Sequence, residues 1–175
     1  MLPNGIEIRR ALPSDIPGIV ALELVNQRGQ GGQLSGFIPE HLLNVMVATM
    51  PVIVAVKDRV IVGFLLIGSA EQNAGIELIE AMLSAYPINP DMLIYGPVCV
   101  ADEVRGLGIA QAMFEALSAI SPGKKFLLFI RADNPSSLRA HDKMGMKQVG
   151  KFQFHEADHI ILAAELGEDR GRAKV

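Results

Sequence analysis

The spacing of apolar residues along the chain predicts strands alternating with helices. Residues 6–9 alternate apolar with polar, as in a half-buried strand, whereas residues 52–56 and 60–67 are almost wholly apolar and flank Lys57-Asp58-Arg59. Two such runs around a short polar turn predict a hairpin that is buried on both faces. Strands are predicted at residues 6–9, 52–56, 60–67, 92–100, 126–131, 146–150 and 159–164, with residues 151–158 joining the last two.

Five helices are predicted between these strands, four from apolar residues at helical spacing and the last from the signals at its two ends. The first follows the turn signal Pro13-Ser14-Asp15, and the second follows Pro39 after a loop at 27–36 that is rich in Gly and Gln and expected to be flexible. The last begins at Asn134, a strong N-terminal signal, and ends before Gly145. The apolar stripes are Ile16, Ile19, Val20, Leu22 and Leu24 in the first helix, Leu42, Leu43, Met46 and Val47 in the second, Ile76, Ile79, Met82, Leu83 and Tyr86 in the third, and Leu107, Ala110, Met113, Phe114 and Leu117 in the fourth.

These elements predict one α/β domain over residues 1–166. The helix within residues 68–91 is an insertion between the third and fourth strands. It is interpreted either as a lid, substrate wall or dimer surface, or as an elaboration of the packing. Residues 167–175 are charged and contain glycine, which predicts a frayed tail.

Length and composition exclude several classes of protein. One domain is expected of 175 residues, and a net charge of −3 without a basic stripe argues against nucleic-acid binding. No apolar run approaches the roughly 18 residues that cross a membrane. A single cysteine excludes an internal disulfide and, with no visible signal peptide, predicts a cytoplasmic protein.

The candidate chemistry begins at residues 105–110, between the fourth strand and the fourth helix. Gly106 and Gly108 allow unusual backbone angles and the close approach of a ligand, while the first turn of a helix offers unpaired N–H groups. Arg105 adds a permanent positive charge suited to phosphate. The stretch therefore predicts a pyrophosphate site, although a glycine turn can also serve packing alone.

The spacing of the glycines decides between the known phosphate motifs. A dinucleotide-binding fingerprint needs Gly or Ala at position 111, which is Gln111 here, and no P-loop string occurs. The string that does occur, Arg105-Gly106-x-Gly108-x-Ala110 after Val98-x-Val100, resembles the acetyl-CoA pyrophosphate loop of the GNAT family of N-acetyltransferases. This resemblance implies a GNAT fold: helices flanking a mixed, mostly antiparallel central sheet that splays between strands four and five. Acetyl-CoA is then the cosubstrate, with its pantetheine arm in the gap.

A second pattern resembles the same family. Residues 134–146 fit N-x-x-A-x-x-L-Y-E-K-L-G-F, which places Asn134 on the asparagine that contacts the pantetheine arm and His141 on the tyrosine that protonates the departing thiolate. Histidine is able to act as this general acid, but a hydrogen bond to the thiol or a helix cap is the alternative. By resemblance the cofactor-binding residues are Val98, Cys99, Val100, Arg105, Gly106, Leu107, Gly108, Ile109, Ala110, Asn134 and Lys143.

The general base is not identified by the sequence. Members that acetylate protein N-termini show a glutamate on the fifth strand, where this chain has Phe129, and the fourth strand carries no carboxylate. Glu80, Glu156 and Asp158 remain candidates, and water is the alternative. Cys99 lacks a nucleophile motif and is expected to be a buried core residue. His155 and His159 invite a metal hypothesis, but no third ligand follows a recognised pattern, so no metal is predicted.

The sequence thus predicts an enzyme that transfers an acetyl group from acetyl-CoA directly to a primary amine of a small molecule. The alternatives are a non-catalytic acyl-CoA-binding regulatory module and acetylation of a protein amine. No nucleic-acid or membrane partner is expected, and a homodimer is compatible with the apolar insertion helix.

Overall fold

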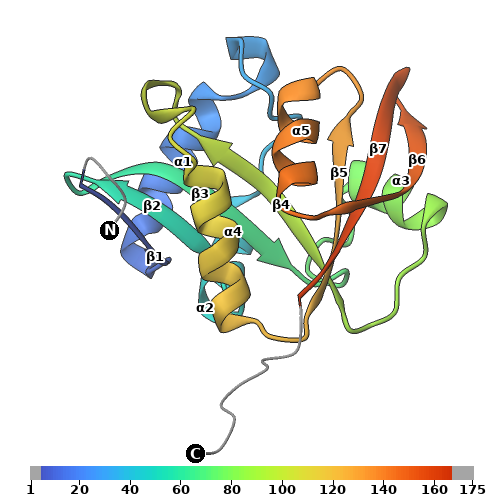
Figure 1. Ribbon diagram of the computed structural model, residues 1–175, viewed down its shortest axis with the longest axis horizontal. Helices are drawn as coiled ribbons and strands as arrows, with labels where there is room; N and C mark the ends of the chain where they lie inside the picture. The colour runs from blue at the N-terminus through green and yellow to red at the C-terminus, as the bar shows by residue number, and fades with distance from the viewer. Residues whose placement is uncertain (1–4, 167–175) are drawn as a thin grey trace, which may run out of the picture. The chain divides into compact units, whose positions relative to one another are not determined.

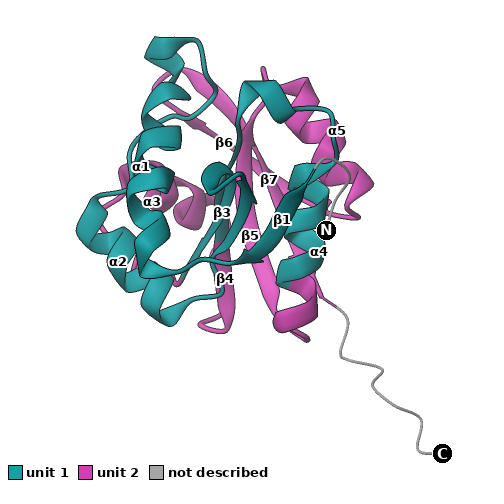
Figure 2. Ribbon diagram, turned by 90° about the vertical axis from the view of Figure 1, so that its left-hand side faces the viewer, with its two compact units in different colours: residues 1–68, 95–117 teal, residues 69–94, 118–175 magenta. Residues whose placement is uncertain are grey.

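The computed structural model describes residues 5–166 and divides the chain into two units. Unit 1 comprises residues 1–68 and 95–117, and unit 2 comprises residues 69–94 and 118–175 (Figure 2). Strand β4 (Met92–Val100) supplies its first three residues to unit 2 and the rest to unit 1. The tail predicted at 167–175 lies outside the described residues.

Unit 1 holds the antiparallel strands at the start of the chain (Figure 1). Its elements are β1 (Ile6–Arg10), α1 (Ile16–Val25), α2 (Glu40–Thr49), β2 (Ile53–Lys57), β3 (Val60–Gly68), the end of β4, and most of α4 (Ile109–Ile120). The strand order is β1-β2-β3-β4. A bulge in the β2–β3 ladder pairs Val56 with Ile61 and Ala55 with Gly63, so Ile61 and Gly63 face opposite sides of the sheet. Helix α1 approaches Ile61 through Gly18, and α4 approaches Gly63 through Ile109.

Unit 2 holds the remaining strands and two helices. Its elements are α3 (Glu77–Ala85), the start of β4, β5 (Lys125–Arg131), α5 (Pro135–Lys143), β6 (Lys147–Phe154) and β7 (Ala157–Glu165), in the strand order β4-β5-β7-β6. Strand β4 pairs in parallel with β5 over Met92–Ile94, whereas the β5–β7 and β6–β7 pairs are antiparallel. This mixed, mostly antiparallel α/β sheet confirms the predicted fold class. The splay of β4 from β5 stays a prediction.

The inserted helix α3 packs on the core of unit 2. Ile79 and Met82 are buried against Ile94, Leu127 and Ile161, which come from β4, β5 and β7. The packing interpretation of residues 68–91 therefore has direct support, because the apolar stripe of α3 is used inside its own unit.

One expectation about unit 1 is wrong. In α1 the buried side chains include Glu23, which is 0% exposed, whereas Leu24, which the spacing placed in the stripe, is 53% exposed. The loop at 27–36 contains internal hydrogen bonds: the backbone N–H of Leu34 donates to the Asn26 carbonyl at 3.0 Å, and Gln27 Nε2 donates to the Gly36 carbonyl at 3.1 Å. Its flexibility stays a prediction.

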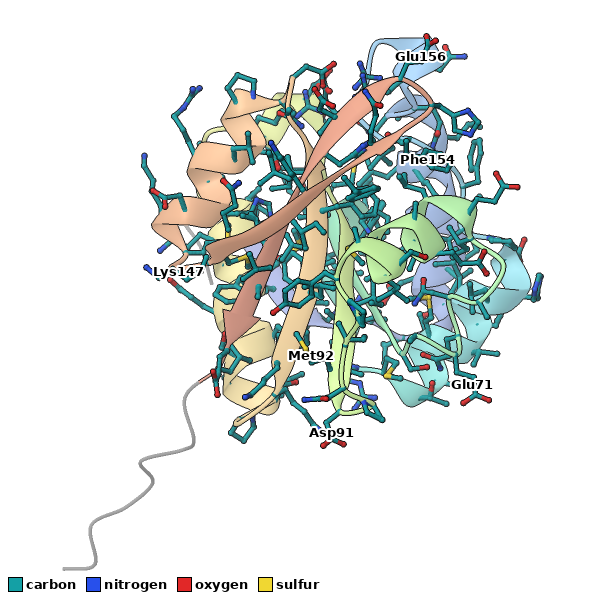
Figure 3. All side chains as sticks on the ribbon, turned by 90° about the vertical axis from the view of Figure 1, so that its right-hand side faces the viewer. Glu71, Asp91, Met92, Lys147, Phe154 and Glu156 are labelled. Atoms are coloured by element: carbon teal, nitrogen blue, oxygen red, sulfur yellow. The ribbon has the colours of Figure 1, made fainter. Side chains whose placement is uncertain are left out.

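The expectation for residues 151–158 is also wrong. These residues are not a connecting loop, because β6 continues to Phe154 and a two-residue turn at His155-Glu156 leads into β7. Figure 3 shows Phe154 and Glu156 at the turn end of this hairpin and Lys147 at its other end. Both turn residues have positive φ, 45° and 61°, which suits the tight turn of a twisted hairpin.

None of the helices in the described part of the chain combines the length and the apolarity needed to cross a membrane.

Candidate functional site

The turn between β4 and α4 presents its backbone to open space. Gly106 and Gly108 have φ angles of +77° and +76°, a conformation that L side chains rarely adopt, so the backbone geometry itself requires glycine. A Cβ at either position would meet nothing within 4 Å, so close packing is not the reason for these glycines. The turn leads into the 12-residue helix α4, whose N-terminal N–H groups and dipole favour an anion. This geometry fits the predicted pyrophosphate.

The Arg105 side chain is held against this turn by contacts with neighbouring residues. Its Nε donates to the Val100 carbonyl at 3.0 Å, its Nη2 donates to Asn26 Oδ1 at 2.8 Å, and its Nη1 forms an ion pair with Asp102. The guanidinium thereby joins the end of β4, the end of α1 and the short helical turn before Gly106. Its side chain remains half exposed, so a phosphate contact stays a prediction.

The last turn of α1 carries two buried polar residues that the sequence did not single out. Asn26 accepts from Arg105 and donates from Nδ2 to the Leu22 carbonyl at 2.9 Å. Glu23 accepts the backbone N–H of Ile38 at 2.9 Å, and burial raises the pKa of its carboxyl above the ordinary value. The one signal in the sequence that could have indicated the burial of Glu23 is the helical spacing of residues 16, 19 and 23, which places them on one face of α1.

The end of β4 places the predicted pantetheine contacts beside the turn. Val98 and Val100 are half-buried, and Cys99 is buried, as expected of a core residue. Burial raises the pKa of the Cys99 thiol to about 12, so it remains protonated and is unsuited to act as a nucleophile.

Asn134 caps helix α5 in unit 2. Its Oδ1 accepts the backbone N–H of Ser137 at 3.2 Å, which confirms the helix start predicted from Asn134-Pro135. At the other end, Gly145 has φ +84° and follows the last turn, again as predicted. Lys143 is exposed there, and its contact with the cofactor stays a prediction.

His141 is buried on α5, with 5% of its surface exposed. Its Nδ1 lies 2.8 Å from the Ser137 carbonyl oxygen and 3.3 Å from the Ser137 hydroxyl. Burial lowers the pKa of the imidazole below its ordinary value, and the backbone hydrogen bond offsets this only in part. The ring is therefore neutral at neutral pH, with the Nδ1 proton held by the Ser137 carbonyl, and must take up a proton before it acts as an acid.

Phe129 lies in an aromatic cluster with Phe152 and His159. The imidazole of His159 stacks on Phe152 with centroids 4.8 Å apart, and both rings meet Phe129 edge-on at 5.6 and 6.0 Å. The cluster joins β5, β6 and β7, so strand pairing assembles it from residues that are far apart in the sequence. No spacing rule within one element predicts it.

The other titratable candidates are dispersed. Glu80 accepts the backbone N–H of Gly75 at 2.8 Å, and Glu156 and Asp158 are exposed at the β6–β7 hairpin. His155 is exposed in the turn, whereas His159 is in the aromatic cluster. Among residues 5–166 no three His, Cys, Asp or Glu side chains are grouped as metal ligands.

The predicted site residues therefore form two groups. Unit 1 contains residues 98–100 and 105–110, which the structure brings together with Asn26 through Arg105. Unit 2 contains Asn134, His141 and Lys143 on or beside α5.

Comparisons with known proteins give consistent results. The model of the family described as acetyltransferase (GNAT) family matches residues 39–146. A GNAT-family acetyltransferase structure from Streptococcus agalactiae is 18% identical, with 94% of this chain and 97% of that chain covered and a TM-score of 0.69. Among the curated proteins, none matches this chain.

Two further solved structures contain the cofactor. A GNAT-superfamily phosphinothricin acetyltransferase from Sinorhizobium meliloti, in complex with acetyl-CoA, is 17% identical, covers 98% of this chain and 94% of its own, and has a TM-score of 0.66. The putative acetyltransferase yncA from Salmonella typhimurium, with acetyl-CoA, is 14% identical, covers 97% and 99%, and has a TM-score of 0.67. At these identities the likeness shows the fold alone.

Proposed function

The chain belongs to the GNAT acetyltransferase family, and from this premise we propose that it transfers an acetyl group from acetyl-CoA to the primary amine of a small molecule. The observation that carries the proposal is the β4–α4 turn, where two left-handed glycines face open space at the start of a helix. Two structurally similar proteins contain acetyl-CoA, which supports this cosubstrate.

In the proposed complex the backbone of the β4–α4 turn binds the pyrophosphate. The N–H groups of residues 106–110 donate to the phosphate oxygens, because a helix N-terminus and its dipole favour negative charge there. Arg105 fixes the shape of the turn through Val100 and Asn26 and adds positive charge nearby. Val98, Cys99 and Val100 supply backbone groups to the pantetheine arm, and Asn134 and Lys143 supply side chains.

The proposed reaction is a direct transfer. The amine nitrogen attacks the thioester carbonyl carbon, and a backbone N–H of β4 stabilises the charge that develops on the carbonyl oxygen. For His141 we propose the weaker of the two roles considered, a hydrogen bond to the thiol, because its neutral ring has no spare proton at neutral pH. Water then protonates the departing thiolate.

Phe129 favours a small-molecule acceptor over a protein N-terminus. The residue stands where the related protein-acetylating pattern has its glutamate, and it packs against Phe152 and His159. The single cysteine of the chain supports a cytoplasmic location, where acetyl-CoA is present. A homodimer remains a proposal, but its contact surface is not assigned to α3, because the apolar stripe of that helix packs inside unit 2.

The first test compares thermodynamic stability with and without acetyl-CoA. Acetyl-CoA at 100 times its dissociation constant should raise the free energy of unfolding of the wild type by about 2.7 kcal/mol. Gly108→Glu should abolish this increment, because it puts a carboxylate beside the phosphates and a side chain at φ +76°.

The matched control is Gly75→Glu. Gly75 also has a positive φ, +84°, and a Cβ added there would meet nothing within 4 Å, so the two variants carry the same strain and charge. Gly75→Glu should retain the increment. If the wild type and Gly75→Glu both fold and acetyl-CoA stabilises neither of them, the proposal is contradicted. Binding without release of CoA thiol on any primary amine favours the non-catalytic module.

A further inference from the structure

A histidine with an available ring nitrogen lies next to the position that lacks the expected carboxylate. Phe129 on β5 occupies the place of the base glutamate in the related pattern, and the ring of His159 on β7 lies 5.6 Å from the Phe129 ring. In the register, Arg131 pairs with His159 and Phe129 pairs with Ile161, which places all four side chains on one face of the sheet. His159 therefore shares a face with the position of the missing base.

Hydrogen bonding fixes which nitrogen of His159 carries the proton. Nδ1 lies 3.0 Å from the carbonyl oxygen of Ala157, a group that only accepts, so in the neutral ring Nδ1 carries the proton and donates it. Nε2 then keeps its lone pair. The stack on Phe152, with an interplanar angle of 17°, holds the ring in this orientation.

The surroundings of His159 keep the ring neutral. Burial lowers the pKa of His159, since only 2% of its surface is exposed, while the hydrogen bond to Ala157 raises it. Arg131 lowers the pKa further, whereas Asp133 and Asp158 raise it. The net effect is a pKa below the ordinary value, so at neutral pH His159 is a base and not an acid.

His159 and His141 lie on opposite faces of β7. Ile160 and Leu162 line a hollow together with Leu138 and Asp142 of α5, so the even-numbered residues of β7 face that helix. His159 and Ile161 alternate with them, and Ile161 packs against α3 on the other face. A group that takes a proton on the α3 face is thus separated by the sheet from the helix that carries His141.

From this arrangement we infer that His159 is the general base of the acetyl transfer, a catalytic role that rests on the proposed function. The nitrogen lone pair of the amine forms a bond to the thioester carbon, and the carbon–sulfur bond breaks with its electron pair passing to sulfur. Nε2 of His159 takes the surplus N–H proton, directly or through one water. The thiolate takes a proton from water, and His159 returns its own to solvent.

The test measures kcat/KM against pH for wild type and His159→Gln, with acetyl-CoA and the best acceptor among spermidine, an aminoglycoside, an amino acid and a tripeptide. His159→Gln should lower kcat/KM by about 10²–10⁴-fold and make the acid side of the profile less steep, because it removes one titrating base and leaves only the ionisation of the amine. It should keep the stabilisation by acetyl-CoA. The control His41→Gln, at an exposed position of α2, should match the wild type.

Three results discriminate further. Exogenous imidazole should restore part of the turnover to His159→Gly, which a packing role alone does not explain. Unchanged kcat/KM and pH profile in a folded His159→Gln, with an active wild type, overturn the assignment of His159 only. An inactive wild type on all four acceptors overturns the proposed function and this inference with it.

Nitrogen NMR of the wild type gives an answer that does not depend on a folded variant. The neutral ring of His159 should show its proton on Nδ1 and a bare Nε2. A proton on Nε2 overturns the inference.

Discussion

Helix α5 and strand β7 each hold one buried histidine, and the two rings are in the same chemical state. His141 and His159 are 5% and 2% exposed, and each has Nδ1 within 3.0 Å of a backbone carbonyl oxygen. Burial lowers the pKa of both. They differ in position: His141 falls on a recognisable family pattern, whereas His159 is found only through the rings around it. A motif position therefore identifies where a side chain lies but not whether it carries a proton.

We expect the larger loss of activity from substitution of His159, the histidine that falls on no family pattern. We expect His141→Gln to lower kcat by less than about tenfold at neutral pH, because a neutral ring with its proton on the Ser137 carbonyl has little to donate. The corresponding effect of His159→Gln is about 10²–10⁴-fold. Steady-state kinetics of the two variants, with one acceptor, measures both. Effects in the reverse order would make His141 the catalytic acid and reduce His159 to packing.

The shared protonation state predicts a shared effect of pH on stability. A histidine whose pKa is lower folded than unfolded binds more protons in the unfolded state, so stability falls as the pH falls through about 6.5 towards the folded pKa. Each ring contributes a slope of up to about 1.4 kcal/mol per pH unit in that range. His141→Gln and His159→Gln should each flatten the decline, as urea unfolding between pH 5 and 7.5 would show.

The exposed histidine provides the reference for this measurement. His41→Gln makes the same substitution at an exposed position of α2 and controls for the change of residue type itself. A slope that is equal in all three variants and the wild type would show that neither buried ring titrates on unfolding, and the comparison would lose its electrostatic basis.

Local signals predicted the elements whose geometry depends on neighbouring residues. The bounds of β4 coincide with the predicted residues 92–100, and α5 begins after its Asn134 cap and ends before Gly145. The glycines of the β4–α4 turn adopt the left-handed angles that the pattern requires. For α5 and the β4–α4 turn the determining interaction lies within one turn of the chain, where residue type alone is informative.

Features that depend on distant contacts were not predicted. Glu23 is buried and its carboxylate accepts the N–H of Ile38, 15 residues later, whereas the neighbouring Leu24 is exposed. The β6–β7 hairpin turns at His155-Glu156, which carry positive φ without the usual Gly or Asn signal. The His159 cluster needs three strands in register before its rings meet.

The smallest predicted effect concerns Asn134, which begins the helix that carries His141. Asn134→Ala should lower the free energy of unfolding by about 1 kcal/mol, since it removes the acceptor for the Ser137 N–H, and Asn134→Ser should restore most of it because serine also caps helices.

Unfolding with and without acetyl-CoA then separates the two roles of this residue. If its amide also contacts the pantetheine arm, Asn134→Ser recovers the stability but loses about 1 kcal/mol of the acetyl-CoA increment, the usual contribution of one hydrogen bond. A full increment in Asn134→Ser would limit Asn134 to capping, and α5 would then act on the cofactor through its position rather than through this motif side chain.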